Sequence, residues 1–239
     1  MGLNFGPQMP KGSLAVLFDP SDPTCAINTT NYKNIVDTAY EFTAYNSPTL
    51  GSGYVEFDNT NDMLVFSSNQ DFQKIYAGVE RTMTVTFKRT TETGEGRIVS
   101  RPWNGSGQYN YQIVYQWNGG SPYVGLSLLG DSSDSYGYNT STFSATDSHT
   151  FTFTFGGRYI RFYLDGQYIH QAEHEITTTN NQYGDFNTVT LGTLYPYGTW
   201  GGNEGFTFGG RIYHFSIYTR VLSDAEVISL HNNLKMRGN

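Results

Sequence analysis

Residues His149–His170 have the sequence HTFTFTFGGRYIRFYLDGQYIH, and this stretch decides the fold. After His149, threonine and phenylalanine alternate, which is the period of a β-strand with one apolar face. Gly156–Gly157 favours a turn into a second strand, Arg158–Leu164. Asp165–Gly166 suits the positive φ values of a type I′ turn, after which Gln167–His170 returns. The sequence therefore predicts three consecutive antiparallel strands.

The same alternation occurs elsewhere in the chain. In Thr82–Lys88 (TMTVTFK) the apolar residues face one side and the threonines the other, which predicts a half-buried strand whose threonine face looks outward. Residues 24–52 have no steady period, and we expect short strands joined by loops there. Further strands are predicted at Leu14–Phe18, Tyr54–Phe57, Met63–Phe66, Arg97–Ser100, Tyr111–Gln116, Tyr123–Leu129, Thr188–Leu191 and Gly209–Tyr218.

One segment near the C-terminal end has helical character, Ser223–Leu234. Ser223 and Glu226 have the spacing of a capping box, and Leu222 with Val227 could form a hydrophobic staple. Many short strands followed by one helix favour a sandwich over an α/β fold. We therefore predict an all-β, two-sheet antiparallel jelly-roll sandwich with one short C-terminal helix.

Composition narrows the classes of partner. Of the 239 residues, 15% are charged and 16% aromatic, and the formal net charge is −7. A negative chain does not attract nucleic acid or anionic membranes, so neither partner is expected. Cys25 is the single cysteine, which excludes an intramolecular disulfide.

The first residues differ in character from the rest. Residues 1–13 are rich in glycine and proline and predict an extended arm, followed by one domain at 14–239. The N-terminal sequence has no basic n-region, and its longest apolar run, Leu14–Phe18, is too short for a signal or membrane segment. We expect that the chain is synthesised in the cytoplasm and does not insert into a membrane.

Seven segments, taken in order, resemble the laminin G-like jelly-roll family of the concanavalin A-like lectin and glucanase superfamily. Tyr163–Gly166 is similar to the family's Y-x-D-G hairpin, and Ile217–Val227 to its closing motif. The matching segments are LFDPSDP (17–23), GSGYVEFDNTNDML (51–64), TMTVTFK (82–88), GRIVSR (96–101), SHTFTFTFGGRYIRFYLDGQYI (148–169), TVTLG (188–192) and GGRIYHFSIYTRVLSDAEVISL (209–230).

The opening MGLNFGP (1–7) and the DPSDP turn (19–23) resemble a subset of these domains found in tailed phages, especially marine phages and cyanophages. This resemblance implies a non-enzymatic virion protein: a capsid decoration, tail fiber or other tail-associated protein made in the host cytoplasm. It also implies attachment to capsid or tail proteins. Abundant tyrosine and few charges suit a homo-oligomer. A carbohydrate-binding module independent of a virion is the alternative.

One turn is rich in the oxygen ligands that calcium prefers. Asp58, Asn59, Asn61 and Asp62 lie within five residues, and related modules often bind calcium. The competing interpretation is that these side chains hydrogen-bond their own backbone to shape the turn, which needs no ion. No cofactor is required on this interpretation. Asp131–Asp134 has a similar composition and a weaker case.

Two loops combine aromatic rings with amides, the groups that bind cell-surface glycans. The rings could instead cover the sandwich or a subunit interface, where tyrosine and tryptophan are also enriched. The candidate glycan-binding residues are Trp103, Asn104 and Tyr109 in one loop, and Tyr195, Tyr197, Trp200 and Asn203 in the other.

A third candidate function is hydrolysis. Retaining glycosidases need two carboxylates about 5 Å apart. The superfamily's hydrolases carry them in a run resembling E-x-D-x-x-E, of which this chain has Glu56 and Asp58 but Asn61 at the last position. The five histidines show no zinc-ligand spacing. We therefore expect no enzymatic activity.

Overall fold

A computed structural model describes most of the chain. It covers residues 12–25, 30–37, 41–67, 80–90, 95–100, 110–118, 121–129, 133–139, 147–173, 188–193 and 207–235. For residues 67, 95, 110–118, 121–129, 133–139 and 188 it describes the backbone. All statements below about what is present or absent refer to these residues.

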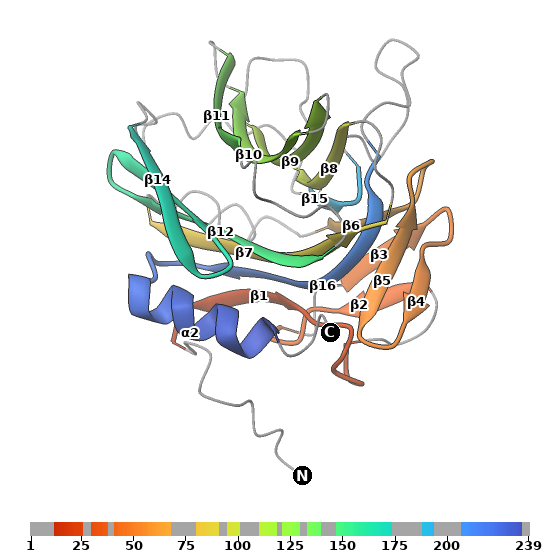
Figure 1. Ribbon diagram of the computed structural model, residues 1–239. Coiled ribbons are helices and arrows are strands. Elements are labelled where there is room, and N and C mark those ends of the chain that lie inside the picture. The colour runs from red at the N-terminus through yellow and green to blue at the C-terminus, as the bar shows by residue number, and fades with distance from the viewer. Residues whose placement is uncertain are drawn as a thin grey trace.

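Two antiparallel sheets form the layers of a sandwich, so the predicted fold class is confirmed (Figure 1). Sheet A has the order β14-β13-β12-β7-β16-β5-β4, with β1 beside β16. Its strands are β1 (Leu14–Phe18), β4 (Thr49–Gly51), β5 (Tyr54–Asp58), β7 (Arg81–Arg89), β12 (Ser148–Gly156), β13 (Tyr159–Leu164), β14 (Gln167–Glu173) and β16 (Gly209–Tyr218).

Sheet B has the order β11-β10-β9-β8-β15-β6-β3-β2. The short strands expected within residues 24–52 are present as β2, β3 and β4. The strands of sheet B are β2 (Asn31–Lys33), β3 (Glu41–Tyr45), β6 (Met63–Ser67), β8 (Glu95–Ser100), β9 (Asn110–Asn118), β10 (Ser121–Leu129), β11 (Ser133–Asn139) and β15 (Thr188–Leu191).

The stretch that decides the fold forms β12, β13 and β14 as three neighbours, as predicted. Asp165 and Gly166 both have positive φ, 52° and 77°, which is the requirement of a type I′ turn. The first turn lies one residue later than expected: β12 includes Gly156, and Gly157, at φ 60°, begins the reversal. Tight turns at both ends fix the register of the ribbon.

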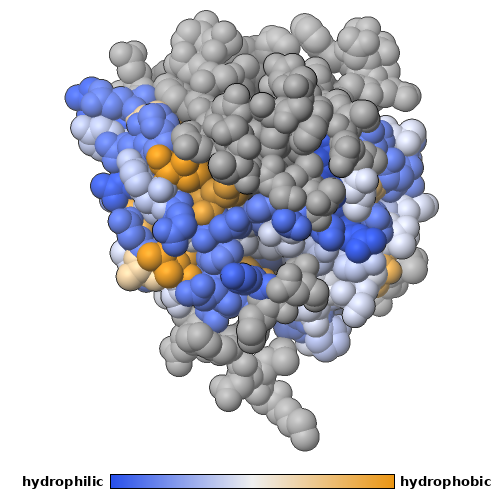
Figure 2. All heavy atoms as spheres, viewed as in Figure 1, coloured by the Kyte–Doolittle hydropathy of each residue, from blue (hydrophilic) through white to orange (hydrophobic). Residues whose placement is uncertain are grey.

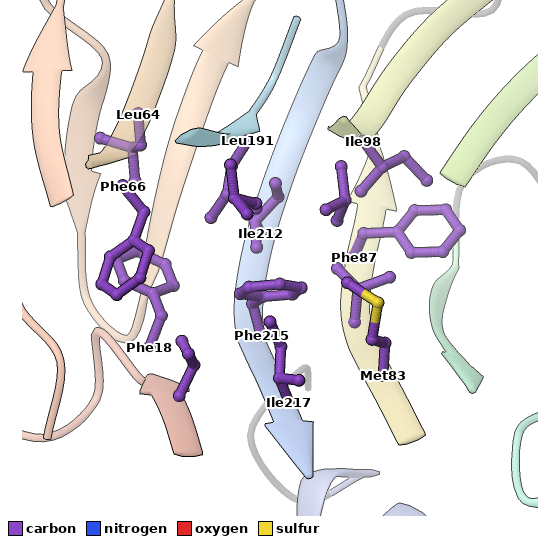
Figure 3. Packing of buried hydrophobic residues seen from close by; sticks show 14 of the residues in the cluster. Phe18, Leu64, Phe66, Met83, Phe87, Ile98, Leu191, Ile212, Phe215 and Ile217 are labelled. Atoms are coloured by element: carbon purple, nitrogen blue, oxygen red, sulfur yellow. The ribbon is translucent and has the colours of Figure 1, made fainter. Parts of the chain in front are cut away.

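The core lies between the sheets and is rich in phenylalanine. Figure 3 shows Leu64, Phe66, Ile98 and Leu191 of sheet B meeting side chains of sheet A, including Phe87. The three phenylalanines of β12 belong to the same buried cluster. Burying a side chain of this size stabilises the fold by roughly 1.5–3 kcal/mol. The alternating phenylalanines therefore make β12 a major contributor to the layer contact.

A β-bulge in β16 changes which residues face the core. The register between β16 and β7 shifts between Ile212 and His214. Strict alternation would place Ile212 and Phe215 on opposite faces, but the extra residue lets both join the buried core, with Ile217 following (Figure 3). The bulge also leaves His214 on the opposite face, paired with Thr86.

The outward threonine face is buried, which corrects the expectation that it would meet solvent. Thr84 bonds Thr152 at 2.9 Å and Thr86 bonds Thr150 at 3.0 Å across β7 and β12. Thr82 accepts a hydrogen bond from the backbone N–H of Leu222 at 2.9 Å, just before the helix. Alternation located the face correctly, but it could not show that another element covers it.

That element is α2 (Asp224–Lys235), which lies on the side of sheet A away from β8–β11 (Figure 1). Leu222, Val227, Leu230 and Leu234 pack with Tyr163, Tyr218 and Leu17 in a second buried cluster. The predicted capping box is confirmed. The Glu226 carboxylate accepts the Ser223 N–H at 2.9 Å, and Ser223 Oγ accepts the Glu226 N–H at 3.4 Å.

The helix also contacts the hairpin turn at one tight point. A Cβ added at Gly166 would lie 3.0 Å from Cβ of His231. A side chain at position 166 would therefore crowd His231, and it would also be strained because Gly166 has a positive φ.

The second acidic segment and the N-terminal arm differ in how far the structure reaches them. Ser133 and Asp134 lie in β11, whereas Asp131 and Ser132 lie outside the described residues. The predicted arm lies outside the described residues except for Gly12 and Ser13. Of the helices described, none is both long enough and apolar enough to cross a bilayer.

The buried imidazole of His214 predicts a pH dependence of stability. Burial lowers the pKa of His214 to about 3, against about 6.5 in an unfolded chain. The unfolded state therefore binds a proton first, and stability is lost as the pH falls below about 6.5. We expect this residue to cost about 2 kcal/mol of unfolding free energy between pH 7 and pH 5. Urea denaturation at the two pH values measures the loss.

The His214→Gln variant serves as the comparison, with His170→Gln, an exposed position, as the matched control. The loss of about 2 kcal/mol that His214 contributes should disappear in the first variant and persist in the second. An identical loss in His214→Gln and the natural sequence would contradict the assignment.

Candidate functional site

The two loops predicted to bind glycans lie outside the described residues. Their candidate residues Trp103, Asn104, Tyr109, Tyr195, Tyr197, Trp200 and Asn203 therefore keep the role of a prediction. A different surface of the described chain carries the same kinds of groups. It is the outer face of the β13–β14 hairpin, formed by Tyr159, Arg161, Tyr168, Gln171 and Glu173 and called the hairpin face below.

Register explains why these residues share one face. Ile160 and Phe162 point into the core, so their neighbours in β13 point outward. Across the ladder, Tyr159 lies opposite Glu173 and Arg161 opposite Gln171. A bulge after Phe162 then brings Tyr168 opposite Tyr163. The type I′ turn therefore aligns two rows of large side chains on the outer surface of β13 and β14.

The polar members of the hairpin face hold one another in place. Arg161 Nε donates to Gln171 Oε1 at 3.0 Å, and Arg161 Nη1 lies 3.8 Å from Asp224 Oδ1 of α2. Arg158 Nη2 donates to Glu173 Oε2 at 3.0 Å. These groups are exposed, so each pair contributes little to stability, and together they present planar donors and acceptors on the outer surface.

Tyr163 connects the hairpin face to the helix. Its hydroxyl donates to Asp224 Oδ1 at 2.8 Å. Burial and the nearby Asp224 carboxylate raise the pKa of Tyr163 to about 12, so the hydroxyl stays protonated and remains a donor. Asp224 therefore lies between Tyr163 and Arg161, which fixes the guanidinium on the side facing α2.

Two tyrosine rings flank these polar groups. Tyr168 is 54% exposed and Tyr159 is 39% exposed. Tyr159 and Tyr163 are four residues apart, and Tyr168 lies opposite Tyr163, so the backbone positions of Tyr159 and Tyr168 are about 13 Å apart along the strands. On the side where Figure 1 labels β14, Figure 2 shows mostly hydrophilic residues with small hydrophobic groups among them. This combination of rings and planar polar groups suits a sugar chain.

Glu56, the first acidic residue of the hydrolase pattern, is paired with an arginine. Glu56 Oε2 lies 3.3 Å from Arg211 Nε, and the Arg211 guanidinium lies 4.4 Å from the ring centroid of Tyr54. The Tyr54 ring in turn covers Gly51, where an added Cβ would lie 2.2 Å from a ring atom. This cluster is therefore a packed arrangement on the outer side of β5 and β16.

The candidate calcium turn connects β5 of sheet A to β6 of sheet B. Asp58 Oδ1 accepts the Thr60 N–H at 2.8 Å and the Asn61 N–H at 3.4 Å, as the turn-shaping interpretation expects. Asn59 has φ 66°. Asp62 Oδ2 accepts the Asp58 N–H at 3.0 Å, whereas Oδ1 is buried without a hydrogen-bond partner.

His149, Asp165 and His231 form a cluster of titratable side chains at α2. His149 Nδ1 lies 2.7 Å from Asp165 Oδ2, and the Thr150 N–H donates to Asp165 Oδ1. Burial would raise the pKa of Asp165, but these hydrogen bonds outweigh it, so the pKa lies below its usual value. Burial lowers the pKa of His231. Among the described side chains, no group of three or more His, Cys, Asp or Glu residues could hold a metal.

The observed fold agrees with the family that a comparison of the sequence identifies. The two-sheet sandwich with an outer helix is a lectin-like architecture, and a family model described as the concanavalin A-like lectin/glucanases superfamily matches residues 49–228. The chain belongs to this superfamily. A search of curated proteins finds no match.

Solved structures with this fold include several that concern glycans. A Trypanosoma rangeli sialidase in complex with 2,3-difluorosialic acid has TM-score 0.70 and 14% identity, over 98% of this chain and 35% of the sialidase. A botulinum neurotoxin type C structure, whose cell entry depends on two ganglioside molecules, has TM-score 0.67 and 14% identity, over 93% of this chain and 51% of that one.

The Ruminococcus gnavus IT-sialidase CBM40 bound to α2,3-sialyllactose has TM-score 0.59 and 19% identity, over 74% of this chain and 96% of the module. This chain spans about a third of the length of the sialidases that it matches. At these identities the likeness shows the fold alone.

The sequence contains a signal for part of the hairpin face, although the sequence predictions above did not include it. Once alternation assigns Ile160 and Phe162 to the core, Tyr159 and Arg161 must point outward. The partners from β14 could not be assigned in the same way, because the bulge after Phe162 shifts their register.

Proposed function

We propose that this chain is a non-enzymatic binding module that recognises glycans through the hairpin face. The observation that carries the proposal is the pair of exposed rings, Tyr159 and Tyr168, on either side of an ordered row of planar polar groups. Sugars present apolar ring faces and hydroxyl edges, which these two kinds of group complement. The lectin-like fold and its carbohydrate-bound neighbour support the same assignment.

The hairpin is a suitable platform because its inward side chains and its turn hold it to the sandwich. The inward side chains of β13 are anchored in the core, and the turn is fixed by Asp165 and Gly166. Arg161 is already oriented by Gln171, so less side-chain freedom is lost when a ligand binds. Single sites of this size bind weakly, and several copies in a homo-oligomer would raise the avidity.

Hydrolysis is less well supported than binding. The hairpin face presents Glu173 and, from α2, Asp224, but each is already paired with an arginine or a tyrosine. Glu56 faces Arg211, and Asn61 stands where the pattern needs its last acid. We therefore assign binding without cleavage.

The phage resemblance suggests where such a module would act. On a virion, the module would belong to a capsid decoration or tail-associated protein, attached to its neighbours through other surfaces. Residues 1–13 remain the predicted attachment arm. Binding of host-surface glycans and attachment to virion proteins are compatible, because they would use different parts of the chain.

Replacing the two exposed rings should weaken glycan binding. For Tyr159→Ala and Tyr168→Ala we expect affinity to fall about three- to tenfold each, because each loses one stacking surface. A glycan array identifies the ligand, and calorimetry with that glycan measures the change. Tyr45→Ala is the matched control, since Tyr45 is also 39% exposed but lies on β3 of sheet B.

The loop variants Trp103→Ala and Trp200→Ala separate two outcomes. Binding lost in these variants and kept in both hairpin variants would reject the hairpin face while leaving glycan recognition intact. Absence of any array signal for the natural sequence would reject glycan recognition itself.

Incubation with the bound glycan should release no reducing sugar. The reason is that Glu56, Glu173 and Asp224 are each engaged by an arginine or a tyrosine. A reducing-end assay over several hours makes the measurement. Release that Glu56→Gln abolishes would show instead that the module is a hydrolase.

An antibody to this chain should label purified phage particles in negative-stain images, at the capsid or the tail. Particles lacking the gene provide the control. If purified virions lack the chain, the virion assignment is wrong, although the glycan assay would still stand.

A further inference from the structure

One side of α2 forms a wall beside the hairpin face. Asp224 Oδ1 lies 3.8 Å from Arg161 Nη1 and accepts the Tyr163 hydroxyl at 2.8 Å. Further along the helix, His231 lies against the hairpin turn, where a Cβ added at Gly166 would be 3.2 Å from Cγ of His231. Because both ends of this helix segment touch the hairpin, α2 runs alongside β13 (Figure 1).

The wall carries an exposed apolar side chain. Ile228 is four residues after Asp224 and three before His231, so the three residues lie on one side of α2. Ile228 is 42% exposed and is not a member of the buried cluster beneath the helix. On the hairpin, the exposed ring of Tyr168 is held edge-on by Tyr163, with ring centroids 5.9 Å apart and planes at 73°. The helix therefore adds a second apolar surface to the hairpin face.

Arg158 and Arg161 are already paired with acidic side chains. Arg158 Nη2 lies 3.0 Å from Glu173 Oε2, and Arg161 lies beside Asp224. Exposed ion pairs of this kind are weak and can rearrange. Asp224, however, is also held by the Tyr163 hydroxyl, and it lies in the first turn of α2, where the helix dipole favours a negative charge. A ligand carboxylate approaching Arg161 would therefore meet the carboxylate of Asp224.

The charge of the whole chain acts in the same direction. Its formal net charge is −7, which repels anionic ligands at long range. An acidic sugar would have to separate an arginine from its carboxylate against this field. A neutral sugar leaves both ion pairs in place, because its hydroxyls can donate to Asp224 and Glu173 and can accept from Arg161.

We propose that the hairpin face, together with Asp224 and Ile228 of α2, selects neutral glycans and discriminates against sugars that carry a carboxylate or a sulfate. Adjacent hydroxyls of a neutral sugar ring match the paired oxygens of a carboxylate and the paired N–H groups of a guanidinium. The apolar face of the ring would lie on Tyr168 or Ile228. This inference rests on the glycan-binding function proposed above and names the class of sugar.

An array of matched neutral and acidic glycans, probed with the full chain, tests the selectivity. Two suitable pairs are lactose with α2,3-sialyllactose, and an oligogalacturonide with its carboxyl-reduced form. Among the pairs that the chain binds, the neutral member should bind at least about tenfold more tightly, because the acidic member loses an ion pair or meets Asp224. Calorimetry with the bound pairs measures the ratio of the two affinities.

Removing either carboxylate should reduce this ratio. Asp224→Asn and Glu173→Gln each leave one arginine without its acidic partner, so the acidic members should bind about three- to tenfold more tightly than they do to the natural sequence. Asparagine at position 224 keeps an oxygen for the Tyr163 hydroxyl, and Glu173→Gln leaves α2 unchanged if the first variant does not fold. Glu41→Gln, on β3 of sheet B, is the matched control for the change in charge.

The role of the helix wall has a separate test. Ile228→Ser should weaken binding of the neutral glycan about threefold, because the ligand loses an apolar contact. The side chain is exposed, so the substitution should leave the fold intact. Val36→Ser, at a residue that is 44% exposed and follows β2, is the matched control.

The outcomes separate this inference from the proposed function. A preference for acidic glycans would overturn the inference and leave glycan recognition intact, as would a neutral preference that both Asp224→Asn and Glu173→Gln leave unchanged. A chain that binds no glycan on the array would overturn both proposals. A smaller affinity ratio in these two variants, with the ratio of Glu41→Gln unchanged, would support the inference.

Discussion

The contact between two facing apolar layers is the constraint on which the rest of this molecule depends. The phenylalanines of β12 and the apolar residues of β7 and β16 fill one side of that contact, and β6, β8 and β15 fill the other. Because side chains alternate along a strand, every residue assigned to this layer sends its neighbours to the outer face. The outer threonines, the hairpin face and the helix-covered surface all follow from it.

Local sequence predicted much of the fold. The alternation in β7 and β12, the positive φ at Asp165–Gly166 and the Ser223–Glu226 capping box each depend on residues close together in the chain, and each is confirmed. The β16 bulge was not predicted, because Gly209–Tyr218 supports two phases of alternation. Burial of the outer threonines was missed because it depends on α2, which lies far away in sequence.

The candidate sites show the same limit more sharply. The composition of the Asp58–Asp62 turn indicated oxygen ligands, but only the folded chain shows that Asp58 shapes the backbone while Asp62 buries an unpartnered oxygen. The hairpin face needed cross-strand partners such as Gln171, which no local pattern supplies. The two loops of the glycan prediction, around Trp103 and Trp200, lie outside the described residues.

The tight contact between Gly166 and His231 has a consequence for how such chains diverge. A turn glycine in β13–β14 and a helix residue 65 positions later fill the same small space. In related sequences, a larger residue at the turn would require a smaller one on the helix, or a shift of the helix along the sheet. The two positions should therefore covary, and their pairing would report on the docking angle of α2 in relatives whose structures have not been determined.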